Sequence, residues 1–216
     1  MDFNSLLSDH AIHIHSIELN SLVGHDIFLF PDEEIQLSKL LNEKRKKEFL
    51  AVRKLRNELL IKSPIGYNEV GKPYLINEPK SAISISHSRN LVTLCKAPFN
   101  IGIDVEVAQN RIHKIIDKFA NNHEKNLYTS THFSLTEWYT LIWCAKEAIY
   151  KLGGLKGVGF KEQIQIERIV VSESEFIKLS ALFSAQNMNT RTIDVFGSKF
   201  KGHIFALAKF KDWPSS

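Results

Sequence analysis

The sequence predicts an α+β fold in which a helix is followed by a small antiparallel sheet, and this order occurs twice along the chain. Apolar residues recur at helical spacing in residues 35–62 and again in residues 138–152. Short alternating or apolar runs, which are typical of strands, follow both segments. Residues 108–110 lie between the two halves and are the expected crossover.

The first half begins with one or two amphipathic helices that carry a basic face. Lysine and arginine residues are interleaved with the apolar positions of residues 35–62, and Pro64 and Gly66 end the helical pattern. A Gly-Lys-Pro turn follows at residues 71–73. Three strands that together suggest an antiparallel sheet are then predicted at residues 82–86, 91–95 and 101–107.

The second half begins with a helix whose N-terminus has the spacing of a capping box at residues 134–137. Its apolar side extends to Leu152, and the glycine pair at residues 153–154 ends it. The Gly-Ser pair at residues 197–198 is expected to form a hairpin turn. Three further strands are predicted at residues 163–170, 191–196 and 199–209.

Composition and length indicate a folded protein of one compact unit or two small lobes. Of the 216 residues, 44% are hydrophobic and 24% are charged, close to ordinary globular usage. Two cysteines and an N-terminus without a secretory pattern suggest a reducing cytoplasm, and no apolar run is long enough to cross a bilayer. The formal net charge of +4 suits an anionic substrate or an acidic partner, but a surplus this small selects neither.

The strand at residues 101–107 carries the most specific candidates for a metal site. Its alternation places Asp104 and Glu106 on one face, together with Gly102. Cα atoms two positions apart on a strand are roughly 6.5–7 Å apart, so both carboxylates can converge on one hard cation. Gly102 is expected to leave room beside them for a ligand. The alternative is the solvated outer face of an edge strand, where acidic side chains are common.

Three other places could carry chemistry, and each has a simpler interpretation. Glu147 and Lys151 lie on one face of a helix, where they could form an ordinary surface ion pair. Ser86 and His87 end a strand at a turn that could hold a phosphate, although serine-rich turns are common without one. Lys72, in the Gly-Lys-Pro turn, could equally be a solvated charge.

The remaining candidates are histidines and the basic helix. His10, His13 and His15 lie close together, and two of them would share one face of a strand. No cysteine or carboxylate completes a tetrahedral set, so surface or edge histidines are the expectation. The basic helix allows a nucleic-acid-binding module, but it lacks interleaved exposed aromatic residues and the spacing of known DNA-binding motifs.

Four motifs in the sequence resemble, by their order and spacing, those of a known enzyme family. They are Gly71-Lys72-Pro73, Ile85-Ser86-His87-Ser88, Gly102-Ile103-Asp104-Val105-Glu106 and Trp143-x-x-Lys146-Glu147-Ala148, the last followed by Lys151. Over residues 43–161 the sequence thereby resembles the surfactin-synthetase-activating type of 4′-phosphopantetheinyl transferase. The last two motifs are specific in combination.

The resemblance implies two similar lobes, 1–107 and 108–216, related by a pseudo-twofold axis. Each would be a helix packed on a small antiparallel sheet, with coenzyme A and a metal ion in the cleft between the lobes. The implied enzyme, of the holo-[acyl-carrier-protein] synthase type, moves 4′-phosphopantetheine from coenzyme A to a serine of an apo acyl or peptidyl carrier protein and releases 3′,5′-ADP. Mg²⁺ is the implied metal, and Mn²⁺ could replace it. A monomeric cytoplasmic enzyme without nucleic-acid or membrane partners is expected.

The resemblance also implies a metal site and catalytic residues. Asp104, Glu106 and Glu147 match the carboxylates that bind Mg²⁺ in the family. Lys151 matches the lysine that contacts the pyrophosphate and donates a proton to the leaving group. Glu147 is the first choice for the base that accepts the serine proton, with Glu124 or a metal-bound water as the alternatives.

Five residues are implied to bind coenzyme A in addition to Lys151. Arg53 and His87 resemble the residues that hold its 3′-phosphate, and Ser86 would bind a phosphate. Lys72 and Pro73 would lie against the adenine end. These roles rest on the resemblance alone.

Two functions of other kinds stay open at this point. A nucleic-acid-binding module would bind in a salt-dependent way and would not need Asp104 or Glu106. A Mg²⁺-dependent phosphohydrolase would release phosphate without a protein acceptor. Residues 120–133, through which family members meet the carrier protein, are polar and poorly patterned, so the sequence specifies neither the carrier nor the pathway, nor whether acyl-coenzyme A is accepted.

Overall fold

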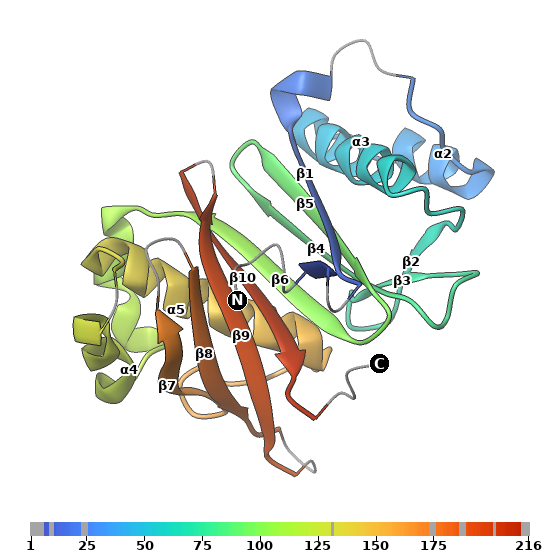
Figure 1. Ribbon diagram of the computed structural model, residues 1–216. Helices are drawn as coiled ribbons and strands as arrows, with labels where there is room; N and C mark the ends of the chain where they lie inside the picture. Colours follow the sequence, from blue (N-terminus) through green and yellow to red (C-terminus); the bar gives the residue numbers. More distant parts are fainter. Residues whose placement is uncertain are drawn as a thin grey trace.

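The computed structural model describes residues 7–8, 11–22, 26–130, 132–172, 176–185, 189–200 and 202–212. Within these residues the chain forms a mixed α+β fold with antiparallel sheets and few helices (Figure 1), which confirms the α+β part of the predicted fold class. None of the helices there combines the length and the apolar character that crossing a membrane requires.

A three-stranded sheet covered by a helix forms the N-terminal part. The antiparallel strands lie in the order β1 (His13–Glu18), β5 (Leu91–Ala97) and β4 (Ala82–Ser88). The predicted basic helical segment consists of two helices, α2 (Pro31–Ser38) and α3 (Glu43–Glu58). Helix α3 packs its buried Val52 and Leu55 against Val92 and Leu94 of β5. Three short elements complete this part: η1 (Leu19–Leu22), β2 (Ile65–Tyr67) and β3 (Pro73–Leu75).

A five-stranded antiparallel sheet forms the C-terminal part. Its strand order is β6 (Ile101–Val107), β10 (His203–Phe210), β9 (Arg191–Phe200), β8 (Phe176–Phe183) and β7 (Ile164–Ser172). Helix α5 (Leu135–Gly153) covers one face of the sheet (Figure 1) and buries Trp138, Leu141 and Ile149 against it. The segment between β6 and α5 contains η2 (Asn110–Lys114), η3 (Ile116–Lys118), α4 (Asn122–Asn126) and η4 (Leu127–Ser130).

Both ends of α5 are formed as the sequence predicts. The backbone N–H of Ser134 donates to Glu137 Oε2 at 2.7 Å, and the backbone N–H of Glu137 donates to Ser134 Oγ at 3.3 Å. This is the predicted capping box. At the other end Gly154 has a φ of 61°, a left-handed conformation that glycine adopts without a steric penalty. The helix is therefore fixed in length by local sequence.

Strand β6 does not extend the first sheet, and the prediction that residues 82–107 form one antiparallel sheet is wrong. β6 pairs instead with β10, so that Asp104 lies opposite Ala206. The pairing joins segments almost a hundred residues apart, and such partners are not visible in local patterns. The carboxylate-bearing strand thus belongs to the sheet that α5 covers.

Serine side chains, rather than a backbone ladder, connect β4 to β6. Ser84 Oγ accepts a hydrogen bond from the backbone N–H of Ile103 at 3.0 Å, and Ser86 Oγ accepts one from the backbone N–H of Val105 at 3.2 Å. Ser84, Ser86 and Ser88 all lie buried along this line. We call these three residues the serine seam. It joins the two sheets through hydroxyl groups, which also satisfy buried backbone donors of β6.

The predicted hairpin turn at residues 197–198 is also wrong, because both residues lie inside β9. A Cβ atom on Gly197 would lie 2.6 Å from Leu141 Cδ1 of α5, so glycine lets this side chain pack closely against β9. Gly202, with a φ of 74°, lies between β9 and β10 instead. A glycine indicates either a turn or a place where another segment packs closely against the backbone, and the sequence alone does not distinguish the two.

Strand β8 was not among the predicted strands. Six of its eight residues are buried, on both faces of the sheet, so the apolar and polar positions do not alternate. Phe176 packs in one core cluster, whereas Ile177 and Leu179 pack in the other. A strand covered on both faces lacks the period of two on which strand prediction depends.

The two faces of β6 have different neighbours. Ile101, Ile103 and Val105 face a core shared with the first sheet. On the opposite face, a Cβ atom placed on Gly102 would overlap the carbonyl oxygen of Ala148 in α5. The expectation that Gly102 leaves room for a ligand is therefore wrong, because the helix backbone fills that space. The alternative interpretation, a solvated outer face of an edge strand, is wrong as well, since α5 covers this face.

The expected division into lobes 1–107 and 108–216 and the pseudo-twofold relation between them stay predictions. The N-terminal sheet has three strands and the C-terminal sheet has five in the described part of the chain. The short ribbon of β2 and β3 is separate from both.

Gly102→Ala is expected to lower the free energy of unfolding by roughly 1–3 kcal/mol, because the added methyl group forces α5 away from β6. Gly197→Ala is the matched control, since its nearest neighbour is the end of the Leu141 side chain, which can move. Urea denaturation of both variants measures the difference. A smaller loss for Gly102→Ala than for Gly197→Ala would show that the α5 backbone does not contact β6 this closely.

Candidate functional site

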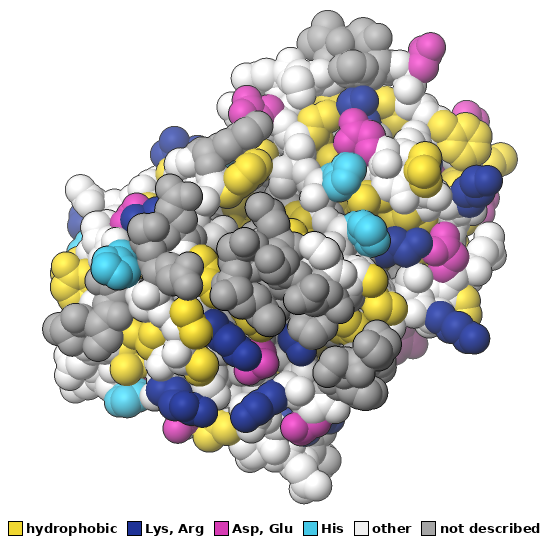
Figure 2. Space-filling model, viewed as in Figure 1, with side chains coloured by type: hydrophobic (Ala, Val, Ile, Leu, Met, Phe, Trp, Pro, Cys, Tyr) yellow, Lys and Arg dark blue, Asp and Glu magenta, His cyan; other side chains and the backbone are white. Residues whose placement is uncertain are grey.

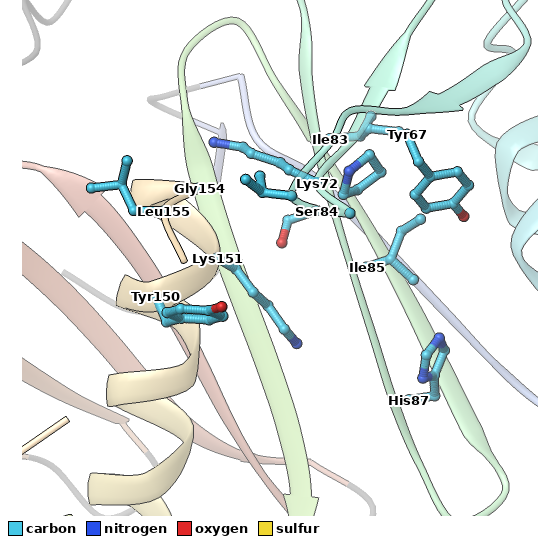
Figure 3. A pocket seen from close by; sticks show the side chains of 13 residues that line it. Tyr67, Lys72, Ile83, Ser84, Ile85, His87, Tyr150, Lys151, Gly154 and Leu155 are labelled. Carbon is cyan, nitrogen blue, oxygen red and sulfur yellow. The ribbon is translucent and has the colours of Figure 1, made fainter. Parts of the chain in front are cut away.

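A cavity of about 210 Å³ opens where the C-terminal end of α5 faces β4 and the β2–β3 ribbon. Figure 3 shows its side chains pointing inward from both sides. We call it the cleft, and its main lining residues are Tyr67, Lys72, Pro73, Ile85, His87 and Lys151. Four of these were predicted from the sequence to bind coenzyme A.

Lys72 connects the ribbon to α5. Its Nζ donates to the backbone carbonyl of Leu152 at 2.9 Å, and its aliphatic stem lies over Gly154. A cation is favourable at this helix C-terminus, where carbonyl groups are unpaired. Burial lowers the pKa of the Lys72 ammonium. Lys72 is therefore part of the cleft wall rather than a solvated charge.

His87 faces the cleft from β4, and its pKa lies below the ordinary value. Desolvation is the main cause, and the positive charges of Lys151 and Arg45 act in the same direction. The carboxylates of Glu48 and Asp104 oppose this shift. A neutral imidazole at pH 7 is the result, and an anion placed beside it would favour its protonated form.

Asp104 is the most buried of the predicted metal ligands, with 5% of its surface exposed. Its Oδ1 accepts hydrogen bonds from Ser86 Oγ and from Lys151 Nζ, both at 2.8 Å. Its Oδ2 is buried and has no hydrogen-bond partner among the residues that the structure describes. A buried carboxylate oxygen without a partner is costly, so this atom is a candidate ligand for a cation.

Glu106 lies at the far end of the same strand face. Its Oε2 accepts a hydrogen bond from Ser88 Oγ at 2.7 Å. It also borders a second cavity of about 240 Å³ between η2 and α5. The main lining residues of this second cavity are Glu106, Val107, Arg111, Ile112, Thr140 and Trp143.

Glu147 faces the strand carboxylates from α5. Burial raises its pKa, and the negative charges of Asp104 and Glu106 raise it further, whereas Lys151 lowers it. The structure gives no ion pair between Glu147 and Lys151, because the ammonium of Lys151 bonds Asp104 and the carbonyl of Ile103 instead. The interpretation of this pair as an ordinary surface ion pair is therefore wrong.

The structure thus brings Asp104, Glu106, Glu147 and Lys151 together beside the cleft. Within the described part of the chain, however, no three acidic, histidine or cysteine side chains are already arranged around one metal position. Mg²⁺ is commonly held by one or two carboxylates together with substrate phosphates and water, so a complete protein cage is not required. The oxygen donors and the unpartnered Oδ2 of Asp104 fit such an ion.

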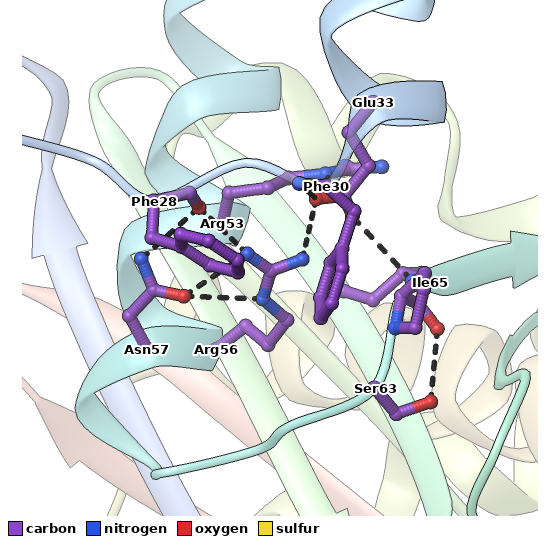
Figure 4. Close-up of polar contacts among 9 residues, drawn as sticks. Phe28, Phe30, Glu33, Arg53, Arg56, Asn57, Ser63 and Ile65 are labelled. Atoms are coloured by element: carbon purple, nitrogen blue, oxygen red, sulfur yellow. Dashed lines mark hydrogen bonds and ion pairs between the residues drawn. The ribbon is translucent and has the colours of Figure 1, made fainter.

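Arg53 is not among the residues that line the cleft. It is 1% exposed, and its Nε donates a hydrogen bond to Glu33 Oε1 at 3.2 Å. Its guanidinium group stacks on the ring of Phe49, with 3.6 Å between Arg53 Cζ and the ring centroid. Glu33 also pairs with Arg56, as Figure 4 shows. Arg53 Nη2 is buried without a hydrogen-bond partner in the described residues. One strong donor of Arg53 is therefore left for another group.

Glu124, the alternative base, also lies apart from the cleft. It is completely buried, and its Oε1 contacts Lys146 Nζ at 2.7 Å and accepts from the backbone N–H of Ile166 at 2.8 Å. Lys146, to which the sequence analysis gave no role, also donates to the carbonyls of Phe160 and Ile164. This pair anchors β7 and the segment before it to α5. The sequence feature that could have revealed this buried ion pair was the position of Lys146 among the apolar residues of the helix.

The histidine and basic-helix candidates have ordinary surroundings. His13 and His15 project from the edge strand β1, and His15 lies 3.7 Å from Glu58, whereas His10 falls outside the described residues. Several basic side chains of α3 pair with acids of the same helix: Lys44 with Glu48, Lys46 with Glu43, and Lys54 with Glu58. On the face in Figure 2, basic and acidic side chains are interspersed.

The sequence model of the 4′-phosphopantetheinyl transferase superfamily matches residues 100–207 of the 216. The chain belongs to this superfamily. The matched region runs from the start of β6 into β10 and contains Asp104, Glu106, Glu147 and Lys151. The family generally uses coenzyme A and a divalent metal and acts on carrier proteins. No curated protein matches the chain.

The arrangement predicts how the pKa of Glu147 responds to its neighbours. Asp104→Asn removes a nearby negative charge and is expected to lower the Glu147 pKa, whereas Lys151→Met removes a positive charge and is expected to raise it. Carbon-13 NMR titration of the glutamate carboxyl groups measures both shifts. An unchanged Glu147 titration in both variants would contradict this placement of the three side chains.

Proposed function

We propose that this protein is a Mg²⁺-dependent 4′-phosphopantetheinyl transferase of the surfactin-synthetase-activating type. It moves the phosphopantetheine arm of coenzyme A to a serine of an apo acyl or peptidyl carrier protein and releases 3′,5′-ADP. The observation that carries the proposal is the meeting of Asp104 on β6 with Glu147 and Lys151 on α5 at the edge of the cleft. We further propose that it acts as a monomer.

The order of features along α5 supports one orientation of coenzyme A. The cleft lies at the Lys151 end, Glu147 lies one turn earlier, and Trp143 borders the second cavity one turn earlier still. At 1.5 Å per residue, about 12 Å of helix separates residues 151 and 143. Coenzyme A is a linear molecule of nucleotide, pyrophosphate and pantetheine. Its nucleotide would enter the cleft, its pyrophosphate would lie at Lys151, and its arm would point toward the second cavity.

The residues that would hold the metal are Asp104, Glu106 and Glu147. Burial is the main cause of the raised pKa of Glu147, and the negative charges of Asp104 and Glu106 add to it. A cation would relieve this repulsion. A divalent ion bound there would stabilise the negative charge that develops on the pyrophosphate as it is split.

Each remaining residue has a role that its position supports. Lys151 would neutralise the pyrophosphate and donate a proton to the leaving group, and Glu147 would accept the proton of the carrier serine. Glu124 is too buried for that role.

The predicted nucleotide contacts divide into two groups. Lys72, Pro73 and His87 line the cleft and can contact the adenine end and the 3′-phosphate directly. Arg53, by contrast, is buried, bonds Glu33 and does not line the cleft, so we do not propose that it contacts the 3′-phosphate directly. A phosphate beside His87 would also favour the imidazolium form, which adds a charge-assisted hydrogen bond.

The proposal is tested by the intact mass of an apo acyl carrier protein after incubation with this protein, coenzyme A and Mg²⁺. A mass gain of one phosphopantetheinyl group, prevented by EDTA, is the expected result. Phosphate release without a carrier adduct would indicate a phosphohydrolase. No gain with several apo carriers, together with no binding of coenzyme A, would overturn the proposal.

Glu147→Gln is the variant to run in the same assay, with circular dichroism to check folding. We expect no transfer, because the amide cannot accept the serine proton. Since the folded state raises the Glu147 pKa, the ionised carboxylate destabilises the fold above that pKa, and the variant should be at least as stable as the wild type at pH 7. Full activity of the folded variant would contradict the role of Glu147.

A further inference from the structure

The serine seam contains three serines at every second position of β4, and they differ in what they contact. Ser84 and Ser86 each accept a hydrogen bond from a backbone N–H of β6, at 3.0 and 3.2 Å. Ser86 and Ser88 each donate to a carboxylate of β6, at 2.8 and 2.7 Å. Two of the three seam residues therefore act on the acidic side chains.

The hydroxyl group of Ser86 has no hydrogen left to donate to a further group. A hydroxyl group has one hydrogen to donate, and that of Ser86 goes to Asp104 Oδ1. Its oxygen accepts from the backbone N–H of Val105. Ser86 is 3% exposed and is not among the residues that line the cleft. The contact that the structure gives Ser86 is with the carboxylate and not with a position for a phosphate.

The contact of Ser86 determines which oxygen of Asp104 stays free. Ser86 and Lys151 both bond Oδ1, and Oδ2 is left buried without a partner in the described residues. Without these two donors the carboxylate could rotate about its terminal torsion, which is a soft one. The seam thus holds Asp104 in one orientation, and Ser88 restrains Glu106 in the same way.

We propose that Ser86 and Ser88 are positioning residues that orient the two strand carboxylates for a divalent metal, and that Ser86 is not a phosphate ligand. The inference rests on the proposed metal site. Side chains that orient metal ligands affect affinity strongly, and their loss typically weakens metal binding by 10–100-fold. Ser84 contacts no carboxylate in the seam and supplies an internal control.

The test is Mn²⁺ binding measured by electron paramagnetic resonance, with and without coenzyme A, for the wild type and for Ser84→Ala, Ser86→Ala and Ser88→Ala. We expect Ser86→Ala and Ser88→Ala to weaken Mn²⁺ binding about 10-fold or more. Ser84→Ala should bind Mn²⁺ like the wild type. Ser84→Ala and Ser86→Ala each remove an acceptor from a buried backbone N–H of β6, so both should lose stability. Ser86→Ala also removes a hydrogen bond to the Asp104 carboxylate, so its loss should be at least as large as that of Ser84→Ala.

Several outcomes would overturn the inference, and all but the last of them would leave the proposed function intact. If Ser84→Ala weakens Mn²⁺ binding as much as the other two variants do, the seam affects the metal site only through the general stability of the fold. If Ser86→Ala binds Mn²⁺ like the wild type but has a raised KM for coenzyme A at saturating metal, Ser86 is a phosphate ligand. If Ser88→Ala binds Mn²⁺ like the wild type, Ser88 does not position Glu106 for the metal. A wild type that binds no Mn²⁺ in either state would overturn the proposed metal site itself.

Discussion

The close contact of α5 with β6 is the constraint on which the site depends. At Gly102 the helix backbone occupies the volume that any side chain would need. This contact sets the distance between the carboxylates of the strand and the acid and lysine of the helix. It also explains why acidic residues can be buried here, since Lys151 reaches across the contact to Asp104 at 2.8 Å. Displacing the helix would separate the two halves of the site without changing any of its residues.

A second consequence concerns how the two sheets are joined. Because β6 pairs with β10, the carboxylates lie on the sheet that α5 covers, while His87 and Lys72 come from the N-terminal elements. The cleft therefore forms between parts of the fold that are connected by the serine seam rather than by a continuous ladder of backbone hydrogen bonds. The seam links the residues proposed to contact the nucleotide on one side to the acidic residues on the other.

The elements that the sequence predicted are those set by local patterns. The capping box and the terminal glycine fixed α5, and regular alternation identified β6. The partner of β6, the central strand β8 and the packing role of Gly197 depend on contacts distant in sequence, which periodicity does not report. In the site, the acids and Lys151 were predicted from motifs. Their hydrogen bonds were not predicted, because the bond of Lys151 to Asp104 depends on the contact of α5 with β6, and the bond of Ser86 to Asp104 depends on the approach of β4 to β6.

The most direct test of this account is the affinity for coenzyme A measured by isothermal titration calorimetry, with Mg²⁺ and with EDTA, in the wild type and in Asp104→Asn. If the carboxylates at the α5–β6 contact hold a metal that also binds the pyrophosphate, Mg²⁺ should tighten binding to the wild type and should have little effect on the variant. Coenzyme A binding of equal strength with Mg²⁺ and with EDTA in the wild type would contradict the account.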